Sequence, residues 1–243
     1  PSSAALTTRE TAYIVDLLKP KAVLRDAYVP CPDHPLILDA QELRAWRDLP
    51  EAAIHWGDPE RLGYVIFTSG TSGKPRAVAH AHRAIWARQM MFDDWYGMTA
   101  NDRVLHAGAF NWTYTLGTGL MDPWSVAATA MIAAPDTPPD YLPDLLAKHH
   151  ATIFAAAPGV YRQLLKSHPL PRFPALRHGL SAGETLPETT ANQWREATGC
   201  EVFEAFGMSE CSTFISQQPP LRATSGTMGR PQRGRRVAVL KDG

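Results

Sequence analysis

The amino-acid sequence predicts an α/β protein built on mostly parallel sheets that are covered by helices. Short apolar runs that suit buried strands alternate along the chain with longer segments of helical periodicity. Strands and helices that alternate in this way form βαβ units, whose sheets are covered on both faces. The 243 residues are 44% hydrophobic and 20% charged, which is typical of a globular chain with one large or two small domains.

The first predicted element is a helix, because Thr7 and Glu10 have the spacing of a capping box and the helical pattern continues to about Leu18. A short strand is expected over 22–24, and a strand over 64–68 leads into a glycine-rich loop. The remaining predicted helices cover 80–96, 115–126, 140–150, 159–166 and 188–198, and the strands cover 103–106, 129–133, 151–157, 176–180 and 201–206. Ligands bind beyond the carboxyl ends of such strands, where the glycine-rich loop is expected to lie.

Proline and glycine become frequent after residue 216, which predicts a boundary at that point. A strand is expected over 235–240, with partner strands beyond Gly243, because a single strand cannot satisfy its own backbone hydrogen bonds. We therefore predict three parts: 1–60 belongs to a first α/β subdomain, 61–216 is a nucleotide- and acyl-binding α/β subdomain, and 217–243 begins a β-rich subdomain.

The composition predicts small-molecule partners and a reducing compartment. Twenty-four basic and 24 acidic residues give a formal charge of zero, which argues against a broad nucleic-acid surface. Three irregularly spaced cysteines suggest neither a disulfide framework nor a zinc site. The sequence has neither an apolar run of the roughly 20 residues that a spanning helix needs nor a signal-peptide pattern, so a cytoplasmic location is expected.

The segment 64–78 carries the main functional signal, because an apolar strand leads directly into small residues that suit phosphate binding. Gly70 and Gly73 can adopt backbone angles that let consecutive N–H groups converge on an anion. Lys74 and Arg76 add positive charge, and hydroxyl donors come from Thr68, Ser69, Thr71 and Ser72. A flexible Gly/Ser linker is the alternative, but a linker would not follow a buried strand.

This loop is not a Walker A loop, although that motif also binds phosphate. Thr68 stands where the motif requires its first glycine, and Pro75 follows Lys74 where the motif requires a magnesium-binding hydroxyl. Pro75 also disfavours a helical conformation at Lys74, so the loop is expected to continue beyond the lysine.

Residues 68–76, Thr-Ser-Gly-Thr-Ser-Gly-Lys-Pro-Arg, instead resemble the phosphate loop of the adenylate-forming superfamily, which includes acyl-CoA synthetases. Residues 203–210, Phe-Glu-Ala-Phe-Gly-Met-Ser-Glu, resemble the aromatic-Gly-x-Thr/Ser-Glu signature of that superfamily. The resemblance implies that Phe206 lies against the adenine, that Ser209 hydrogen-bonds near the α-phosphate and that Glu210 binds Mg²⁺. An aromatic face and a carboxylate suit these roles.

The resemblance extends to Ser181-Ala-Gly-Glu184, which is similar to the superfamily segment that flanks the adenine. Catalytic roles are implied for Lys74, Arg76, Ser209 and Glu210. Contacts with ATP are implied for Thr68, Ser69, Gly70, Thr71, Ser72, Gly73, Lys74, Pro75, Arg76, Gly183, Glu184, Glu204, Ala205, Phe206, Gly207, Met208 and Ser209.

Residues 106–117 and the following Asp122-Pro123-Trp124 resemble the acyl-site segment of medium-chain acyl-CoA synthetases. The implied substrate pocket consists of Asn111, Trp112, Tyr114 and Gly207, although either ring alone is equally well explained as a core aromatic. Amino-acid-activating members carry an Asp where this chain has Asn111, and acetyl-CoA synthetases carry a Trp where it has Gly207. We therefore expect a medium-chain, branched or aromatic acid, and we expect Gly207→Trp to shift preference towards acetate.

Two other motifs have simpler explanations. Gly179–Gly183 matches the G-x-S-x-G elbow of serine hydrolases, but those enzymes place their histidine after the serine and all nine histidines here precede Ser181. Pro187 also delays the helix that should follow an elbow, so the hydrolase hypothesis ranks second. His80 and His82 have a metal-like spacing without an acidic or cysteine partner nearby, so we predict that they begin a helix.

The resemblance implies an acyl-CoA synthetase that converts a carboxylic acid and Mg-ATP to an acyl-adenylate and pyrophosphate, and then forms a thioester with coenzyme A. Delivery of the acyl group to a carrier protein, or a non-enzymatic nucleotide-binding remnant, are the alternatives. The superfamily's ribose-binding Asp segment and mobile C-terminal domain have no match in these residues, so this chain alone is expected to be weak or inactive. The sequence leaves the oligomeric state open, with a homodimer as one option.

Overall fold

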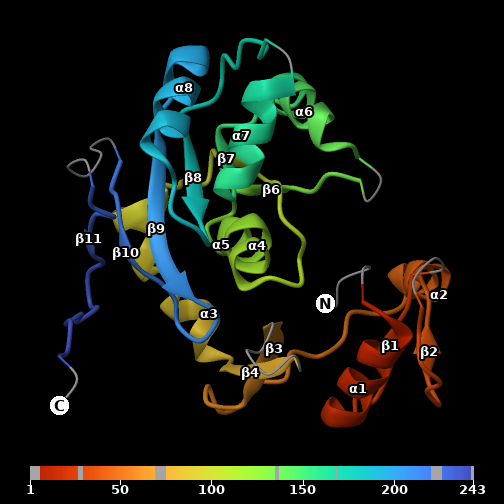
Figure 1. Ribbon diagram of the computed structural model, residues 1–243. Helices are drawn as coiled ribbons and strands as arrows, with labels where there is room; N and C mark the ends of the chain where they lie inside the picture. The colour runs from red at the N-terminus through yellow and green to blue at the C-terminus, as the bar shows by residue number, and fades with distance from the viewer. Residues whose placement is uncertain are drawn as a thin grey trace. The chain divides into compact units, whose positions relative to one another are not determined.

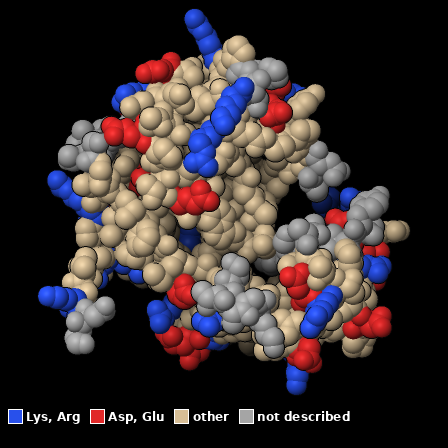
Figure 2. All heavy atoms as spheres, viewed as in Figure 1, with Lys and Arg blue, Asp and Glu red and all other residues tan. Residues whose placement is uncertain are grey.

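The structure is a computed structural model that describes residues 6–26, 30–68, 75–134, 137–167, 169–219 and 226–241. The chain forms two compact units, Pro1–Asp58 and Pro59–Gly243 (Figure 1). Within the described ranges, no helix has both the length and the apolar character needed to cross a membrane. Acidic and basic side chains are interspersed on the face seen in Figure 2.

The first unit contains helix α1 (Thr8–Leu18), the parallel strands β1 (Val23–Leu24) and β2 (Ile37–Leu38), helix α2 (Ala40–Ala45) and a 3₁₀ turn at Trp46–Asp48. The predicted capping box is confirmed, because the Thr7 side chain accepts from the Glu10 N–H and the Glu10 carboxylate accepts from the Thr7 N–H. A second capping box at the start of α2, Asp39 with Glu42, was not predicted.

A seven-stranded sheet forms the centre of the second unit, with the order β11-β10-β9-β8-β7-β5-β6 among the described residues. The parallel strands are β5 (Arg103–His106), β6 (Thr129–Met131), β7 (Ile153–Ala156), β8 (His178–Ala182) and β9 (Val202–Met208). Two antiparallel strands at one edge, β10 (Ser212–Ser216) and β11 (Arg230–Pro231), were not predicted. The predicted fold class, α/β with a mostly parallel sheet, is confirmed.

Helices connect the parallel strands, as expected. The predicted helices over 140–150, 159–166 and 188–198 correspond to α6 (Leu142–Lys148) with a preceding 3₁₀ turn at Pro139–Tyr141, α7 (Pro158–Ser167) and α8 (Glu188–Thr198). The helix predicted over 115–126 consists of α4 (Thr113–Leu116) and α5 (Asp122–Ser125), which are joined by a π-helical turn at Gly117–Met121.

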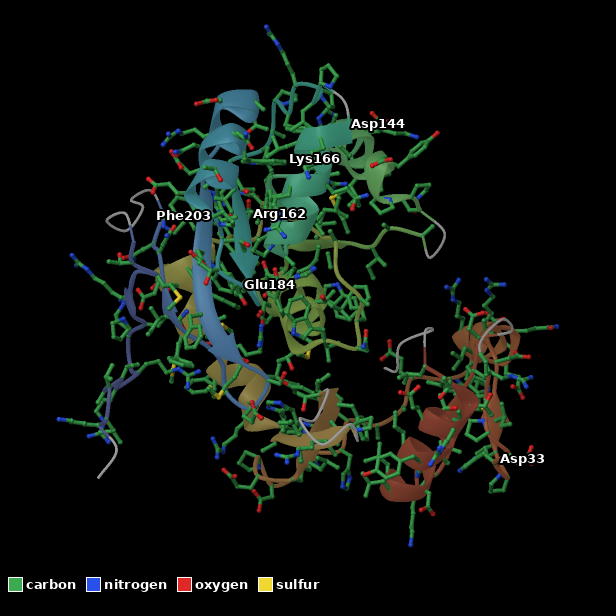
Figure 3. All side chains as sticks on the ribbon, viewed as in Figure 1. Asp33, Asp144, Arg162, Lys166, Glu184 and Phe203 are labelled. Atoms are coloured by element: carbon green, nitrogen blue, oxygen red, sulfur yellow. The ribbon has the colours of Figure 1, made fainter. Side chains whose placement is uncertain are left out.

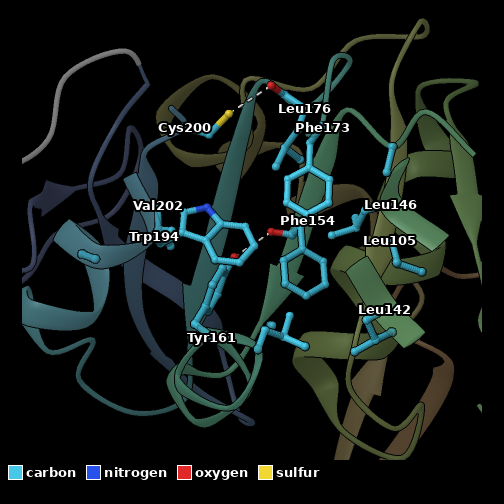
Figure 4. Close-up of a cluster of buried hydrophobic side chains, with 14 of the residues drawn as sticks. Leu105, Leu142, Leu146, Phe154, Tyr161, Phe173, Leu176, Trp194, Cys200 and Val202 are labelled. Carbon is cyan, nitrogen blue, oxygen red and sulfur yellow. Dashed lines mark hydrogen bonds between the residues drawn. The ribbon is translucent and has the colours of Figure 1, made fainter. Parts of the chain in front are cut away.

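Both faces of the sheet are buried, as β7 shows most clearly. Phe154 belongs to one cluster of buried side chains and Ile153 to a second, because successive side chains of a strand point to opposite faces. In the first cluster the Phe154 and Trp194 rings stack 5.8 Å apart, and the Tyr161 hydroxyl donates to the Phe154 carbonyl (Figure 4). Burial on two sides explains why β7 is a continuous apolar run in the sequence.

The strand before the glycine-rich loop lies outside this sheet, contrary to the prediction of a parallel βαβ unit. β3 (Leu62–Thr68) pairs with β4 (Arg76–Ala81) in an antiparallel hairpin of its own. β4 supplies the backbone partners that β3 needs, so β3 requires no place in the parallel sheet. β3 is also not a buried strand, since only Ile66 within it is fully buried.

The helix predicted over 80–96 is wrong at its start for the same reason. His80 lies in β4, helix α3 covers only Arg83–Ala87, and a π-helical turn covers Phe92–Tyr96. The strand predicted over 235–240 is also wrong, since this segment has no regular structure and Val239 is 100% exposed. It has no neighbouring strand in the described part of the chain, and an unpaired strand leaves its backbone groups unsatisfied. The predicted subdomain limits at 60/61 and 216/217 stay predictions.

Candidate active site

A cavity of about 220 Å³ lies beyond the carboxyl ends of β8 and β9, the edge at which parallel sheets bind ligands. Figure 3 shows Glu184 where β8 ends. The cavity is lined by Arg88, Met91, Trp95, Trp112, Thr113, Tyr114, Thr118, Ala182, Gly183, Gly207, Met208, Ser209, Ser212 and Thr213. The structure therefore brings together the predicted pocket residues Trp112, Tyr114 and Gly207. Asn111 lies in the turn before α4 and does not line the cavity.

Aromatic side chains form the apolar wall of this cavity. The Trp112 ring meets the Tyr114 ring edge to face at 5.3 Å, and Tyr114 stacks on Trp95 at 5.7 Å. The Tyr114 hydroxyl donates to the Leu180 carbonyl at 3.0 Å, so this residue belongs to the core and to the cavity at once. Gly183 has a φ of +97°, and a Cβ at that position would lie 2.5 Å from Trp112 Cη2. Glycine at position 183 is therefore what leaves room for the Trp112 ring.

A buried ion pair forms the polar side of the cavity. The Arg88 guanidinium donates two hydrogen bonds, of 2.8 and 2.7 Å, to the Asp122 carboxylate, and the two side chains are 4% and 1% exposed. Arg88 also donates to the Ser212 hydroxyl at 2.6 Å, and the Tyr96 hydroxyl donates to Asp122 at 2.7 Å. Burial alone would lower the pKa of Arg88, but the Asp122 charge, the hydrogen bonds to Asp122 and the neighbouring Tyr96 and Tyr64 together raise it, so Arg88 stays charged.

Neither member of this pair was predicted as a site residue. Asp122 was noted only as part of the Asp-Pro-Trp segment, and Arg88 lies 34 positions earlier in the chain. A contact over such a sequence separation leaves no local periodicity or motif, so the pair becomes visible only in the folded chain.

The turn between β9 and β10 carries Ser209 and Glu210 and borders the cavity. Ser212, where this turn ends, has a φ of +59°, which residues other than glycine rarely adopt. The His80 ring of β4 faces the Ser209 backbone and stacks on Tyr64 with ring centres 4.5 Å apart. His80 therefore lies beside this turn and does not begin a helix, contrary to the prediction. Burial lowers the pKa of the His80 imidazole.

The predicted adenine-binding residues come from neighbouring strands. Ala182 pairs with Ala205, which places the following residues Gly183 and Phe206 at the same edge of the sheet. Phe206 is 40% exposed and meets the Phe214 ring edge to face at 5.3 Å. An exposed ring beside glycine backbone suits the flat face of a base. The adenine contacts of these residues stay predictions.

Glu204 is a predicted nucleotide contact whose side chain is buried within the protein. One carboxylate oxygen accepts from the Leu186 N–H at 2.8 Å, and the Glu204 N–H donates to the Gln217 side chain at 3.3 Å. Ala205 is also buried, at 3% exposure. These contacts join the segment after β8, and Gln217 directly after β10, to β9, so they hold the edge at which Phe206 is exposed.

The predicted phosphate-loop residues Ser69, Gly70, Thr71, Ser72, Gly73 and Lys74 lie outside the described residues. Their described neighbours define the two ends of the loop. Thr68 ends β3 and pairs with Arg76, the first residue of β4, while Pro75 immediately precedes β4.

The residues present fit a magnesium ion that arrives with a nucleotide. In the described ranges, no three His, Cys, Asp or Glu side chains are arranged to hold a metal ion. Mg²⁺ commonly takes one or two carboxylates from the protein and its other ligands from phosphate and water. Glu210, a single carboxylate on the turn beside the cavity, matches that requirement, and its role as a ligand stays a prediction.

Gly207 lies close to β10. The Gly207→Trp variant suggested by the sequence is therefore a poor test of acid preference. An added Cβ would collide with the Ser212 carbonyl oxygen and would lie 2.5 Å from Thr213 Cα. Gly207→Trp would therefore disturb the pairing of β9 with β10, and a changed acid preference in that variant would not isolate the size of the cavity.

The structure does not support a serine hydrolase. Ser181 is 0% exposed and lies inside β8, whereas a nucleophile elbow presents its serine on an exposed turn after the strand. His178, the histidine closest in sequence, directs its Nε2 to the Tyr96 carbonyl at 2.8 Å.

Known proteins with related sequences are carboxylate ligases. A 3-hydroxybenzoate–CoA ligase of Aromatoleum sp. (strain CIB) is 31% identical over 175 residues, which is 71% of this chain and 34% of that protein. The human mitochondrial acyl-coenzyme A synthetase ACSM3 is 25% identical over 253 residues, or 95% of this chain and 43% of that protein. The crystal structure of a benzoate CoA ligase from Burkholderia xenovorans LB400 superposes with a TM-score of 0.83 at 25% identity, covering 96% of this chain and 50% of that one.

The chain spans about a third to a half of the length of these curated relatives. The sequence profile of the AMP-binding enzymes matches all of residues 1–243. The chain therefore belongs to the AMP-binding enzyme family.

Proposed function

We propose that this chain is the acid- and nucleotide-binding part of an AMP-forming acid–CoA ligase. The observation that carries the proposal is the aromatic cavity that opens beside the Ser209–Glu210 turn at the carboxyl ends of β8 and β9. The acid would occupy the cavity with its carboxylate towards this turn. The relatives named as CoA ligases support coenzyme A rather than a carrier protein as the acceptor.

The first reaction is attack of the acid's carboxylate on the α-phosphorus of ATP, which gives an acyl-adenylate and pyrophosphate. Such chemistry depends on positioning and on stabilisation of charge that develops on phosphate. Ser209 would hydrogen-bond near the reacting phosphate, and the predicted phosphate loop with Arg76 would hold the remaining phosphates. Mg²⁺, held by Glu210 when bound, supplies further neutralisation of phosphate charge.

The proposed substrate is a medium-chain, branched or aromatic acid, and the cavity favours the aromatic member of this set. Three aromatic rings line the cavity, those of Trp95, Trp112 and Tyr114. A cavity of about 150 Å³ is known to hold benzene, so about 220 Å³ is enough for a substituted ring. The cytoplasmic location and the homodimer stay predictions.

The test is carboxylate-dependent exchange of labelled pyrophosphate into ATP by the whole protein that contains this chain. The acids are acetate, octanoate, benzoate and hydroxybenzoates. We expect exchange with the aromatic acids, a loss of at least 100-fold in Glu210→Ala, and no loss in Glu196→Ala, a matched change at an exposed position of α8. Exchange that survives in Glu210→Ala would contradict the proposed role, and ATP binding without exchange for any acid would favour the nucleotide-binding remnant.

A further inference from the structure

The turn between β9 and β10 ends on a residue with an unfavourable backbone conformation. The Cys211 N–H donates to the Met208 carbonyl at 3.3 Å, so Ser209 and Glu210 are the two central residues of a β-turn. Ser212 follows with a φ of +59°, in the left-handed region. Glycine adopts that region freely, whereas the Cβ of any other residue makes it costly. The turn therefore keeps this shape only if contacts of Ser212 offset the cost.

Arg88 makes such a contact with the Ser212 side chain. An Arg88 N–H donates to the Ser212 hydroxyl at 2.6 Å, across 124 positions of sequence. Hydrogen bonds from a charged donor are roughly twice as strong as those between neutral groups. The Ser212 backbone is confined as well, because a Cβ at Gly207 would collide with the Ser212 carbonyl oxygen. Ser212 is therefore fixed through its side chain and through its backbone.

The Arg88 guanidinium is itself held in one orientation. It donates two hydrogen bonds to the Asp122 carboxylate and one, of 3.1 Å, to the Tyr96 hydroxyl. It also packs directly against the backbone of Gly117, where an added Cβ would overlap the guanidinium. A side chain that is locked by packing and by hydrogen bonds positions the group that it contacts. The bond to Ser212 therefore fixes the end of the turn relative to α5, the helix that begins at Asp122.

We propose that Arg88 is a positioning residue for the adenylation step. Acting through Ser212, it holds the turn that carries Ser209 and Glu210 in the conformation that the reaction requires. Arg88 also lines the cavity, but its charge is balanced by Asp122 at 2.7 Å, so this role requires no contact with the acid's carboxylate. The inference rests on the proposed function, because the roles of Ser209 and Glu210 belong to it.

Two variants of Ser212 separate the conformation of the turn from the loss of a hydrogen bond. Ser212→Ala removes the hydroxyl that Arg88 contacts and keeps the cost of the left-handed conformation, whereas Ser212→Gly removes both. Ser216→Ala is the matched control. Ser216 lies in the same strand, is 4% exposed and donates to the Asp94 carbonyl at 2.7 Å, yet among the described residues it does not line the cavity.

The measurement is kcat and KM for pyrophosphate exchange by the whole protein, with the acid that the wild type uses best, together with the Mg²⁺ concentration that gives the half-maximal rate. We expect Ser212→Ala to lower kcat at least tenfold, to leave KM for the acid within threefold, and to raise the required Mg²⁺ concentration at least threefold. Ser212→Gly should be at least threefold faster than Ser212→Ala. Ser216→Ala should stay within twofold of the wild type in kcat, although it also loses a buried hydrogen bond.

A double-mutant cycle tests whether Arg88 acts through Ser212. The variant Arg88→Met, Asp122→Leu removes the donor together with its counter-ion, so it leaves no unpaired buried charge. We expect this variant to lower kcat by about the same factor as Ser212→Ala. We expect the addition of Ser212→Ala to it to change kcat by less than about twofold, because residues that act as one unit give non-additive losses.

Four outcomes would overturn the inference. They are an unchanged kcat or Mg²⁺ requirement in Ser212→Ala, an equal or larger loss in Ser212→Gly, an equal loss in Ser216→Ala, and losses that multiply when Ser212→Ala is added to the double variant. Each of these leaves wild-type exchange in place, and with it the proposed function. Absence of exchange with every acid in the wild type would contradict the proposed function instead, so the two failures are distinguishable.

Discussion

The buried pair of Arg88 and Asp122 gives the sharpest test of how this unit is held together, and Asp122→Ala is the perturbation. The variant leaves the Arg88 guanidinium charged in a site where its side chain is 4% exposed, and it removes the acceptor of two Arg88 hydrogen bonds and one from Tyr96. Loss of one partner from a buried ion pair costs about 3–5 kcal/mol, because the other charge remains uncompensated. The cost should appear as a lower free energy of unfolding.

Urea and thermal unfolding, followed by circular dichroism, measure that cost. For a chain of this size about 1 kcal/mol lowers Tm by about 2–4 °C, so Asp122→Ala should lower Tm by about 6–20 °C. Asp93→Ala is the control, because Asp93 pairs with Arg233 at a site where the two side chains are 78% and 74% exposed, and such pairs contribute little. A Tm within 3 °C of wild type in Asp122→Ala would refute the reasoning, as would an equal effect of the control.

The double variant Arg88→Met, Asp122→Leu separates the cost of an unpaired charge from the value of the pair. Replacing a buried pair by apolar residues of similar size is often neutral. We therefore expect the double variant to recover more than half of the Tm lost in Asp122→Ala. A double variant less stable than Asp122→Ala would show that the pair itself, rather than compensation of charge, stabilises the unit.

Two further predictions follow from individual sites. Gly183→Ala should lower kcat/KM for pyrophosphate exchange by at least tenfold, because its Cβ would displace Trp112, whereas Gly199→Ala, with a φ of +74° and no atom within 4 Å, should cost only stability of about 1 kcal/mol. His178 should contribute up to about 3 kcal/mol to a fall in the free energy of unfolding as the pH falls from 6.5 to 4, because burial lowers its pKa to about 4 and the unfolded chain takes up the proton first; buried His106, whose pKa is lowered to about 3, adds a similar contribution. His178→Gln should flatten this dependence in urea titrations, and an unchanged slope would contradict it.

The sequence was most informative where local pattern and tertiary structure agree. β7 is a continuous apolar run because both faces of the sheet are buried, and α8 was predicted with its observed bounds, Glu188–Thr198, from its helical pattern. The capping box of α1 was equally visible, since it depends only on Thr7 and Glu10.

The sequence was least informative where a segment's partner decides its structure. The run from Arg76 to Ala81 has no strong strand pattern, and it is a strand because β3 lies beside it. Conversely, the apolar run after Arg235 looks like a strand but lacks a neighbour among the described residues. The cavity shows the same limit: Trp112 and Tyr114 belong to a motif, while Arg88 reaches the cavity only through contacts that the fold creates.

Contacts of the turn between β9 and β10 also connect the predicted acid-binding residues with the predicted phosphate-binding residues. Ser212, where the turn ends, accepts a hydrogen bond from Arg88, which lines the cavity, and Ser209 is faced by His80, which belongs to the hairpin of β3 and β4. Ser212 keeps an unfavourable φ of +59°, and the hydrogen bond from a buried, fixed guanidinium stabilises that conformation. The acid, the α-phosphate and the magnesium carboxylate would then be positioned by one turn with two supports. Weakening either support should therefore reduce the chemical step more than the binding of either substrate, because only the reaction requires both substrates to be aligned.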